Sequence, residues 1–241
     1  MSSSRIRRFA SAPWRRALIA LGAGLDRARD AIAQARLPRF ATAAPGLTVR
    51  WPFEVRHPER VHLGRDVRFG PNTVLLLMTT YPGGWMRHPD GDHVEHRFDP
   101  QLRIGDRVTV TYGLHVTVYD RVTIGDDVMF AGNVYIEDGT HARRRGDVAY
   151  KYQGIERIAP VSIGHGAWIG QNAVILPGVR VGDRAIIGAN TVVTRDVPDA
   201  CIAVGAPARI VRRWDSDTAR WTAARLDADP RDPNSEHGGT T

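Results

Sequence analysis

Cysteine, lysine and long apolar runs are all scarce in this chain of 241 residues. Cys201 is the only cysteine, so no disulfide can form within one chain, which fits a reducing compartment. Lys151 is the only lysine, and arginine therefore supplies nearly all the basic charge behind a formal net charge of +7. No apolar run reaches the length of a membrane-spanning helix, so none is expected. The length suits one domain with appendages, or two small domains.

The excess of arginine leaves several kinds of partner open. Guanidinium groups bind phosphate and carboxylate in a bidentate manner, so a basic balance suits an anionic ligand, a membrane surface or nucleic acid. The sequence contains no recognised nucleic-acid-binding motif, which argues against nucleic acid. Genome composition is an equally simple explanation of the arginine content.

The N-terminal segment, residues 1–45, is basic and has the pattern of one or two helices. The arginines around its short apolar run, 17–21, are Arg5, Arg7, Arg8, Arg15 and Arg16. Such a segment fits a basic amphipathic helix that touches anionic lipid or packs on the body of the protein. A secretory signal is a third interpretation.

From residue 163 onward the sequence repeats every six residues. The consecutive hexads read IGHGAW, IGQNAV, ILPGVR, VGDRAI, IGANTV and VTRDVP. All their first positions are β-branched, and their fifth positions are small or β-branched. The same register recurs upstream, in blocks that begin at Leu63, Ile104 and Ile124. A repeat of this kind predicts a stack of similar units that bury one continuous core.

Each hexad predicts a short strand followed by a turn. Neighbouring strands of successive coils lie about 4.8 Å apart, so the apolar first positions stack inside the body. No helical segment of ten residues separates the strands, which argues against βαβ units, and the regular spacing argues against a β-sandwich. After this body, residues 211–227 predict a C-terminal helix, and 228–241 predict a disordered tail rich in Pro, Gly and polar residues.

These hexads, together with AVGAPARIVRRW at 203–214, resemble the hexapeptide-repeat acyltransferase family. Within it the chain is most similar to sugar O-acetyltransferases, including those of maltose, galactosides, O-antigen and capsule. The resemblance covers roughly 60–210 and implies an all-β fold, a left-handed parallel β-helix with three hexads in each triangular coil. It also implies acetyl-CoA as the acyl donor, and a homotrimer whose active site lies between adjacent subunits.

Two insertions interrupt the predicted coils, at 78–101 and at 142–160. The first is rich in Pro, Gly and His, and a long loop of this kind can cover an acceptor site. Its histidines match no standard zinc spacing, so no metal is expected. The second begins after His141, where the resemblance places the family's catalytic base. Many O-antigen-type relatives read Asp-His-x-His here, whereas this chain has Asp-Gly-Thr-His and lacks the first histidine.

Acetyl transfer from a thioester to a hydroxyl requires a base, an oxyanion donor and a groove for the cofactor. A histidine suits the first role because its unperturbed pKa lies near neutrality. We expect His141 to deprotonate the acceptor and then protonate the departing thiolate. Asp138 or Glu137 would orient its imidazole, although Asp138 could instead cap a turn. His115, one coil earlier, either contacts the acceptor or forms a structural polar corner.

Matching the family's acetyl-CoA contacts motif by motif implies seven cofactor-binding residues. They are Trp168, Gln171, Ala189, Thr194, Arg195, Arg209 and Arg212. In the resembled enzymes a lysine follows the threonine, and Arg195 keeps that charge here. Arg209 and Arg212 would bind the phosphate end of the cofactor. For Trp168, packing is the competing interpretation.

The sequence therefore predicts an acetyl-CoA-dependent O-acetyltransferase that acts on a sugar of a cell-surface glycan or a glycosylated small molecule. We expect it in the cytoplasm, and at the inner membrane face if the basic N-terminus binds lipid. An N-acetyltransferase or xenobiotic acetyltransferase of the same fold, and a non-catalytic scaffold, are the alternatives. A carbonic anhydrase of the γ class is disfavoured, because ARRRGD after His141 contains no further histidine for zinc.

Overall fold

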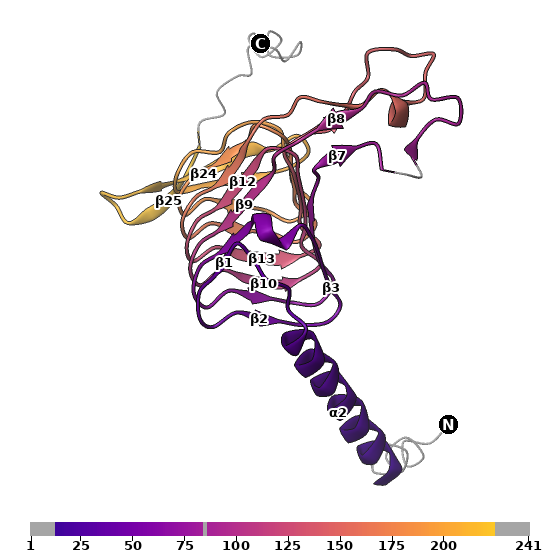
Figure 1. The fold of residues 1–241 in the computed structure, drawn as a ribbon. Helices are drawn as coiled ribbons and strands as arrows, with labels where there is room; N and C mark the ends of the chain where they lie inside the picture. Colours follow the sequence, from indigo (N-terminus) through magenta and orange to yellow (C-terminus); the bar gives the residue numbers. More distant parts are fainter. Residues whose placement is uncertain (1–12, 84–85, 225–241) are drawn as a thin grey trace, which may run out of the picture.

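The computed structural model describes residues 13–83 and 86–224. Its body is a left-handed parallel β-helix, as predicted, in which three parallel sheets form the faces of a triangular prism (Figure 1). The predicted tail over 228–241 lies outside the described residues, as do Arg5, Arg7 and Arg8. In the part of the chain that is described, no helix is both long enough and apolar enough to cross a bilayer.

The three sheets share the strands of successive coils. Sheet A contains β1 (Thr42–Ala43), β4 (Val61–Leu63), β9 (Gln101–Ile104), β12 (Arg121–Ile124), β17 (Val161–Ile163) and β20 (Arg180–Val181). Sheet B contains β2 (Thr48–Val49), β5 (Arg68–Phe69), β10 (Thr109–Tyr112), β13 (Met129–Gly132), β18 (Trp168–Ile169), β21 (Ile186–Ile187), β23 (Cys201–Val204), β24 (Arg209–Asp215) and β25 (Arg220–Ala223). Sheet C contains β3 (Phe53–Arg56), β6 (Thr73–Leu77), β11 (His115–Val118), β14 (Tyr135–Glu137), β19 (Val174–Ile175) and β22 (Val192–Val193).

The first positions of the hexads stack inside the prism, as the repeat predicts. In sheet C one such column runs through Leu75, Val116, Ile136, Ile175 and Val193, which pair in register from coil to coil. All five side chains are fully buried. Burying one such side chain contributes roughly 1.5–3 kcal/mol, so the column is a main source of stability.

The body begins one coil earlier than the predicted start at residue 60. Ala43, Val49 and Val55 pair in register with Leu63, Phe69 and Leu75 of the next coil. These three residues keep the six-residue spacing of the repeat. The hexads that they begin have no glycine at the second position, and each contains a proline one or two residues after that position. The glycine signal was therefore missing where the apolar spacing was still present.

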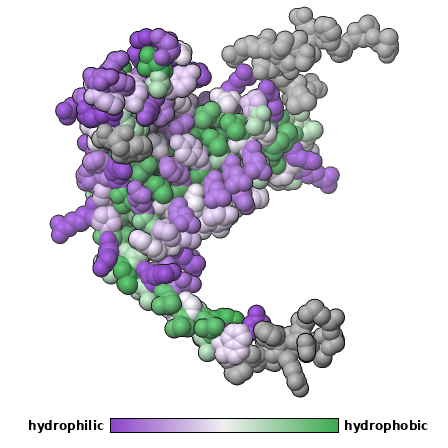
Figure 2. Space-filling model, turned by 90° about the vertical axis from the view of Figure 1, so that its right-hand side faces the viewer, coloured by the Kyte–Doolittle hydropathy of each residue, from purple (hydrophilic) through white to green (hydrophobic). Residues whose placement is uncertain are grey.

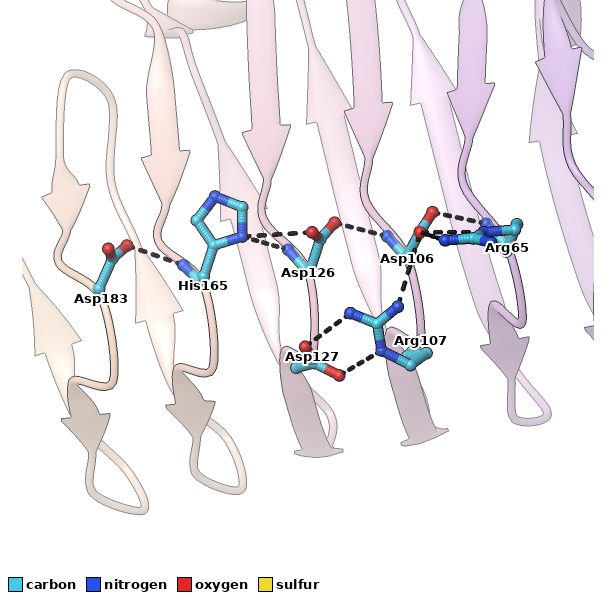
Figure 3. A network of polar contacts seen from close by, with 7 residues as sticks. All are labelled: Arg65, Asp106, Arg107, Asp126, Asp127, His165 and Asp183. Atoms are coloured by element: carbon cyan, nitrogen blue, oxygen red, sulfur yellow. Dashed lines mark hydrogen bonds and ion pairs between the residues drawn. The ribbon is translucent and has the colours of Figure 1, made fainter.

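A ladder of side chains joins the coils along the edge between sheets A and B (Figure 3). Each carboxylate accepts a hydrogen bond from a backbone N–H one coil earlier, as in the bonds from Arg65 N–H to Asp106 (2.9 Å) and from Asp106 N–H to Asp126 (2.7 Å). His165 takes the place of an aspartate, because its Nδ1 accepts from Asp126 N–H at 3.0 Å. The ladder continues through Asp183, which accepts from His165 N–H at 2.9 Å.

Replacing Asp106 with alanine is expected to lower the urea midpoint of unfolding at pH 7. The backbone and side-chain hydrogen bonds from Arg65 hold the pKa of the Asp106 carboxyl below its ordinary value. The carboxylate therefore stabilises the fold above its ordinary pKa, and this stabilisation is lost as the pH falls through the lowered pKa. Urea unfolding at several pH values should show the difference from the wild type shrinking with acidification. Asp106→Asn keeps an acceptor for the backbone N–H, and an equal loss in both variants would contradict the ladder's role.

The two ends of the body differ in how well they were predicted. The N-terminal segment forms a helix in its described part, α2 (Pro13–Ala35), which projects away from the prism (Figure 1). The predicted C-terminal helix over 211–227 is wrong for its described part, which forms the hairpin of β24 and β25. β24 pairs with β23 at the edge of sheet B, and Trp214 faces Trp221 across the hairpin with ring centroids 5.5 Å apart. Edge pairing and a cross-strand aromatic pair thus outweigh local helix propensity.

Candidate active site

The second insertion leaves the prism at the edge between sheets C and A. β14 ends at Glu137, and β15 (Thr140–His141) then turns away from the prism to pair antiparallel with β16 (Ile155–Glu156). Gly139 lies at the turn, where an added Cβ would lie only 2.8 Å from the ring of Tyr119. The regular coil therefore ends where the sequence predicted, and His141 is the last residue of the outgoing strand.

The two insertions pack against each other. The first is closed by β7 (Thr80–Tyr81) and β8 (His96–Arg97), which pair antiparallel. Val94 N–H donates to the carbonyl of Tyr152 at 3.0 Å, and the rings of His88 and Tyr152 meet edge-on with centroids 4.7 Å apart. Segments separated by some sixty residues in the sequence thus form one projecting unit beside His141 (Figure 1).

Tyr81 fixes the orientation of His141. Its ring is 2% exposed and meets the imidazole edge-on, with centroids 5.5 Å apart. The phenol O–H donates to the carbonyl of Lys151, and its oxygen lies 3.3 Å from His141 Nδ1. Because that one hydrogen is already donated, the oxygen accepts a hydrogen bond from Nδ1–H. The network therefore assigns the proton to Nδ1 and leaves the lone pair on Nε2 of an exposed side chain.

Burial keeps the phenol of Tyr81 neutral, because desolvation raises its pKa. A neutral phenol retains the hydrogen that it donates to Lys151, so the assignment of the His141 tautomer holds at physiological pH. Tyr81 was not among the predicted site residues. Sixty residues separate it from His141, and no spacing in the sequence indicates the contact.

The contacts of Asp138 favour the turn-capping alternative over the predicted role of orienting His141. Its side chain is fully buried, and its carboxylate accepts backbone hydrogen bonds from Tyr119 (2.7 Å), Asp120 (2.8 Å) and Arg121 (2.7 Å). Both oxygens are thus committed to the turn of the preceding coil. Asp138 therefore caps a turn, and it does so at the point where the second insertion leaves the prism.

His115 lies on the outer face of sheet C, whereas His141 has left that sheet. Its ring lies beside that of Tyr135, with centroids 5.1 Å apart, and its Nε2 is 3.2 Å from Thr117 Oγ1. Tyr135 in turn donates to Glu137 Oε2 at 3.0 Å. Burial lowers the pKa of His115 and raises that of Glu137, because desolvation disfavours the charged form of each group. A polar patch of this kind suits hydrogen bonding to hydroxyl groups.

Two of the predicted cofactor residues lie in one row across the outer face of sheet B. Register places Trp168 beside Ile186, Ile186 beside Ile202, and Ile202 beside Arg212. Trp168 is 46% exposed, so solvent access favours a binding role over packing. The row offers an apolar strip that ends on a guanidinium group.

The other predicted cofactor residues lie at other places in the C-terminal coils of the prism. Gln171 and Ala189 lie at the edge between sheets B and C, where Asn190 N–H donates to the Gln171 carbonyl at 2.8 Å. Thr194 and Arg195 follow β22 at the edge between sheets C and A, two coils beyond the point where the second insertion leaves. Arg209 begins β24 opposite Val204. One chain therefore distributes the seven residues over several places.

Within residues 13–83 and 86–224, no group of three or more His, Cys, Asp or Glu side chains could hold a metal ion. In the first insertion, the side chain of His93 is 8% exposed, and its Nε2 lies 3.3 Å from Arg87 and 3.4 Å from Glu95. These histidines and acids take part in the packing of the insertion.

Known proteins resemble the chain in both sequence and fold. The model of the bacterial transferase hexapeptide family (six repeats) matches residues 160–195. Galactoside O-acetyltransferase of Escherichia coli (strain K12) is 30% identical over 172 residues, which cover 69% of this chain and 76% of that protein. A protein named "Probable acetyltransferase" from Mycobacterium tuberculosis is 31% identical over 189 residues, which cover 77% of this chain and 59% of that protein.

The fold is also found among solved structures. AntD, an N-acyltransferase from Bacillus cereus, was solved in complex with dTDP and 3-hydroxybutyryl-CoA. It superposes with a TM-score of 0.57 at 14% sequence identity, covering 74% of this chain and 86% of AntD. At this identity, the likeness is one of fold.

Proposed function

Because this chain belongs to the hexapeptide-repeat acyltransferase family, we propose that it transfers an acetyl group from acetyl-CoA to a sugar hydroxyl, with His141 as the general base. The observation that carries the proposal is the pairing of His141 with Tyr81. An exposed imidazole whose Nδ1 proton is held by a buried phenol presents the Nε2 lone pair to a substrate. The named galactoside acceptor of the Escherichia coli relative supports a sugar as the acceptor.

In the proposed reaction, His141 Nε2 takes the proton of the acceptor hydroxyl as its oxygen attacks the thioester carbonyl. The resulting imidazolium keeps its Nδ1–H on Tyr81, so the ring does not turn between the two steps. The C–S bond then breaks, and the thiolate of CoA takes the proton from Nε2. One histidine thus serves as base and then as acid, and no covalent acyl-enzyme is needed.

The proposed cofactor site uses the row of Trp168 and Arg212 on sheet B, and the proposed active form is a homotrimer. The acyl-CoA bound to AntD, which shares the fold, supports the choice of donor. The distribution of the predicted cofactor residues over several edges of one chain supports an assembly in which neighbouring copies complete the groove. The partly buried apolar side chains on the outer face of sheet C, among them Val74, Val174 and Val192, suit such contacts.

Acetyl-CoA is expected to raise the thermal midpoint of the wild type, and less so that of Arg212→Ala. A ligand at a hundred times its dissociation constant stabilises the folded state by about 2.7 kcal/mol. Arg68→Ala is the matched control, because Arg68 is also exposed on the outer face of sheet B but several coils away. Differential scanning fluorimetry measures all three proteins. No shift with millimolar acetyl-CoA in the wild type would refute the donor.

The acceptor is tested by CoA release with a panel of glycosides and amino sugars. Turnover with hydroxyl acceptors, and acetate esters in the products by mass spectrometry, are the expected results. Acetamides formed only with amino sugars would replace the O-acetyltransferase with an N-acetyltransferase. Binding of acetyl-CoA without turnover of any acceptor would favour the non-catalytic scaffold.

Tyr81→Phe is expected to lower kcat about 3- to 10-fold while the thermal shift with acetyl-CoA stays unchanged. The variant removes both hydrogen bonds of the phenol, the one donated to the Lys151 carbonyl and the one accepted from His141. The bond with His141 has a net worth of roughly 0.5–1.5 kcal/mol, and each 1.36 kcal/mol is about tenfold in rate. Without that bond, the imidazole can adopt either tautomer, and only one leaves Nε2 free. Steady-state kinetics measure kcat, and the matched control is Tyr150→Phe, an exposed tyrosine of the same unit. Equal loss in both variants would contradict a positioning role for Tyr81.

A further inference from the structure

The helix α2 is hydrogen-bonded to the body through Asp30 and Gln34. Gln34 donates from Nε2 to the Leu47 carbonyl (2.8 Å), and its Oε1 accepts from Val49 N–H (3.1 Å). One turn earlier, Asp30 Oδ1 accepts from Trp51 N–H (3.2 Å). These contacts lie in the last turns of the helix, so its remaining length extends beyond the prism (Figure 1).

An apolar stripe runs along the opposite face of α2. Its members are spaced alternately by four and three residues: Trp14, Leu18, Leu21, Leu25, Ala28, Ile32 and Ala35. With 3.6 residues per turn, this α2 stripe lies about half a turn around the helix from Asp30 and Gln34. Its large side chains are more than half exposed, from 52% at Ile32 to 60% at Leu21. Figure 2 shows hydrophobic residues along the projecting helix.

The spacing of the α2 stripe is that of a coiled-coil seam. Alternating steps of four and three keep one side of a helix against a partner helix over successive heptads. Three of the four positions beside the seam in its first half are small, namely Ala17, Gly22 and Gly24, and the fourth is Arg15. Small flanking residues allow partner helices to approach closely, whereas two glycines weaken a helix that stands alone, by about 1 kcal/mol each relative to alanine. A packing partner would therefore stabilise the helix.

The α2 stripe is continuous with an apolar hollow at the base of the prism. A cavity of about 460 Å³ lies between the last turns of α2 and the first coil. Its apolar lining includes Ile32, Leu37, Trp51, Phe53 and Val55. Ile32 belongs to both features, so the exposed stripe runs without interruption into the body. A rod-shaped partner parallel to α2 would cover the stripe and reach this hollow.

We propose that α2 forms a parallel coiled coil with the α2 helices of further copies of this chain. A second copy provides a helix with the same heptad spacing, and cyclic symmetry about an axis along the helix gives the two helices the same orientation. The narrow seam distinguishes this from insertion into a lipid surface, which favours a broad apolar face opposite a strongly basic one. On α2 the exposed face away from the seam carries both Asp26 and Arg27. The proposal concerns assembly and holds for any acceptor or acyl donor.

Disulfide cross-linking of full-length chains tests the seam directly. Ala28→Cys places a thiol on the α2 stripe, and Ala23→Cys places one on the exposed opposite face. In a parallel coil, seam positions bring Cα atoms near the 4.4–6.8 Å that a disulfide needs. Mild oxidation is expected to convert most of Ala28→Cys, and little of Ala23→Cys, into covalent dimers on a non-reducing gel. The native Cys201 is buried and common to both variants. No cross-link at Ala28→Cys, or equal cross-linking of both, overturns the proposal.

Two further measurements separate this seam from a lipid-binding face and from a folding defect. Adding Leu18→Glu and Leu25→Glu to Ala28→Cys should abolish the cross-link, whereas adding Ile19→Glu, off the stripe, should preserve it. A thermal midpoint of the β-helix that stays within a few degrees shows that the body remains folded. Vesicles of phosphatidylcholine and phosphatidylserine should leave the cross-link unchanged. Vesicle binding that requires Leu18 and Leu25 and suppresses the cross-link would assign the stripe to a membrane and overturn the proposal.

Discussion

Replacing His141 with glutamine is expected to lower kcat by about 10²- to 10⁴-fold, the usual contribution of a positioned general base. Glutamine approximates the size of the imidazole and can still hydrogen-bond to Tyr81, but its amide takes no proton from the acceptor hydroxyl. The loss should therefore fall on kcat, while the thermal shift with acetyl-CoA stays at its wild-type value. Steady-state release of CoA in the presence of a glycoside acceptor measures the effect.

The control for this prediction is His165→Gln. His165 lies in the ladder between sheets A and B, on a different edge of the prism from the insertion that carries His141 (Figure 3). Its replacement should leave kcat within about twofold, a difference of roughly 0.4 kcal/mol in the barrier. If His141→Gln retained wild-type turnover, the general base would lie elsewhere and the proposed mechanism would fail.

Replacing Asp138 with alanine is expected to lower the free energy of unfolding by about 3 kcal/mol or more. Hydrogen bonds to charged groups contribute roughly 1.5–3 kcal/mol each, and the variant leaves three backbone N–H groups of the preceding turn without their acceptor. Urea unfolding followed by circular dichroism measures the loss. Asp138→Asn is the matched variant, because its amide oxygen still accepts part of these bonds and should restore part of the stability.

The same pair of variants separates the structural role of Asp138 from a catalytic one. If Asp138 only caps the turn, the folded fraction of Asp138→Asn should keep a kcat near that of the wild type. A large fall in kcat with an unchanged free energy of unfolding would instead return Asp138 to the reaction. The buried position of the carboxylate, away from the exposed ring of His141, favours the first result.

The β-helix was predictable because its repeat is local. Six-residue spacing determines which side chains point inward, so the stacked column of Ile136, Ile175 and Val193 follows from the sequence alone. The place of the second insertion was predictable for the same reason, since a break in a regular pattern is itself visible. The first coil was missed because it keeps the spacing without the glycines that usually accompany it.

The contacts of the site were less predictable because they join distant segments. Tyr81 reaches His141 only after two insertions have packed together, and no periodicity encodes that meeting. Asp138 stands three residues before His141, which suggested a contact, but its carboxylate binds the backbone of the turn in the preceding coil. The C-terminal hairpin was predicted as a helix because local propensity says nothing of strand pairing. β24 is a strand because it pairs with β23.

The projecting helix also makes the chain well suited to attachment. At about 1.5 Å per residue, the 23 residues of α2 form a rod of roughly 35 Å. The rod leaves the molecule on the side away from the two insertions beside His141 (Figure 1). A bead, sensor surface or fused enzyme coupled ahead of Pro13 would thus be held at a distance, with the reactive end of the protein facing outward. Immobilisation through this end should preserve turnover, whereas coupling through Lys151, in the second insertion, should not.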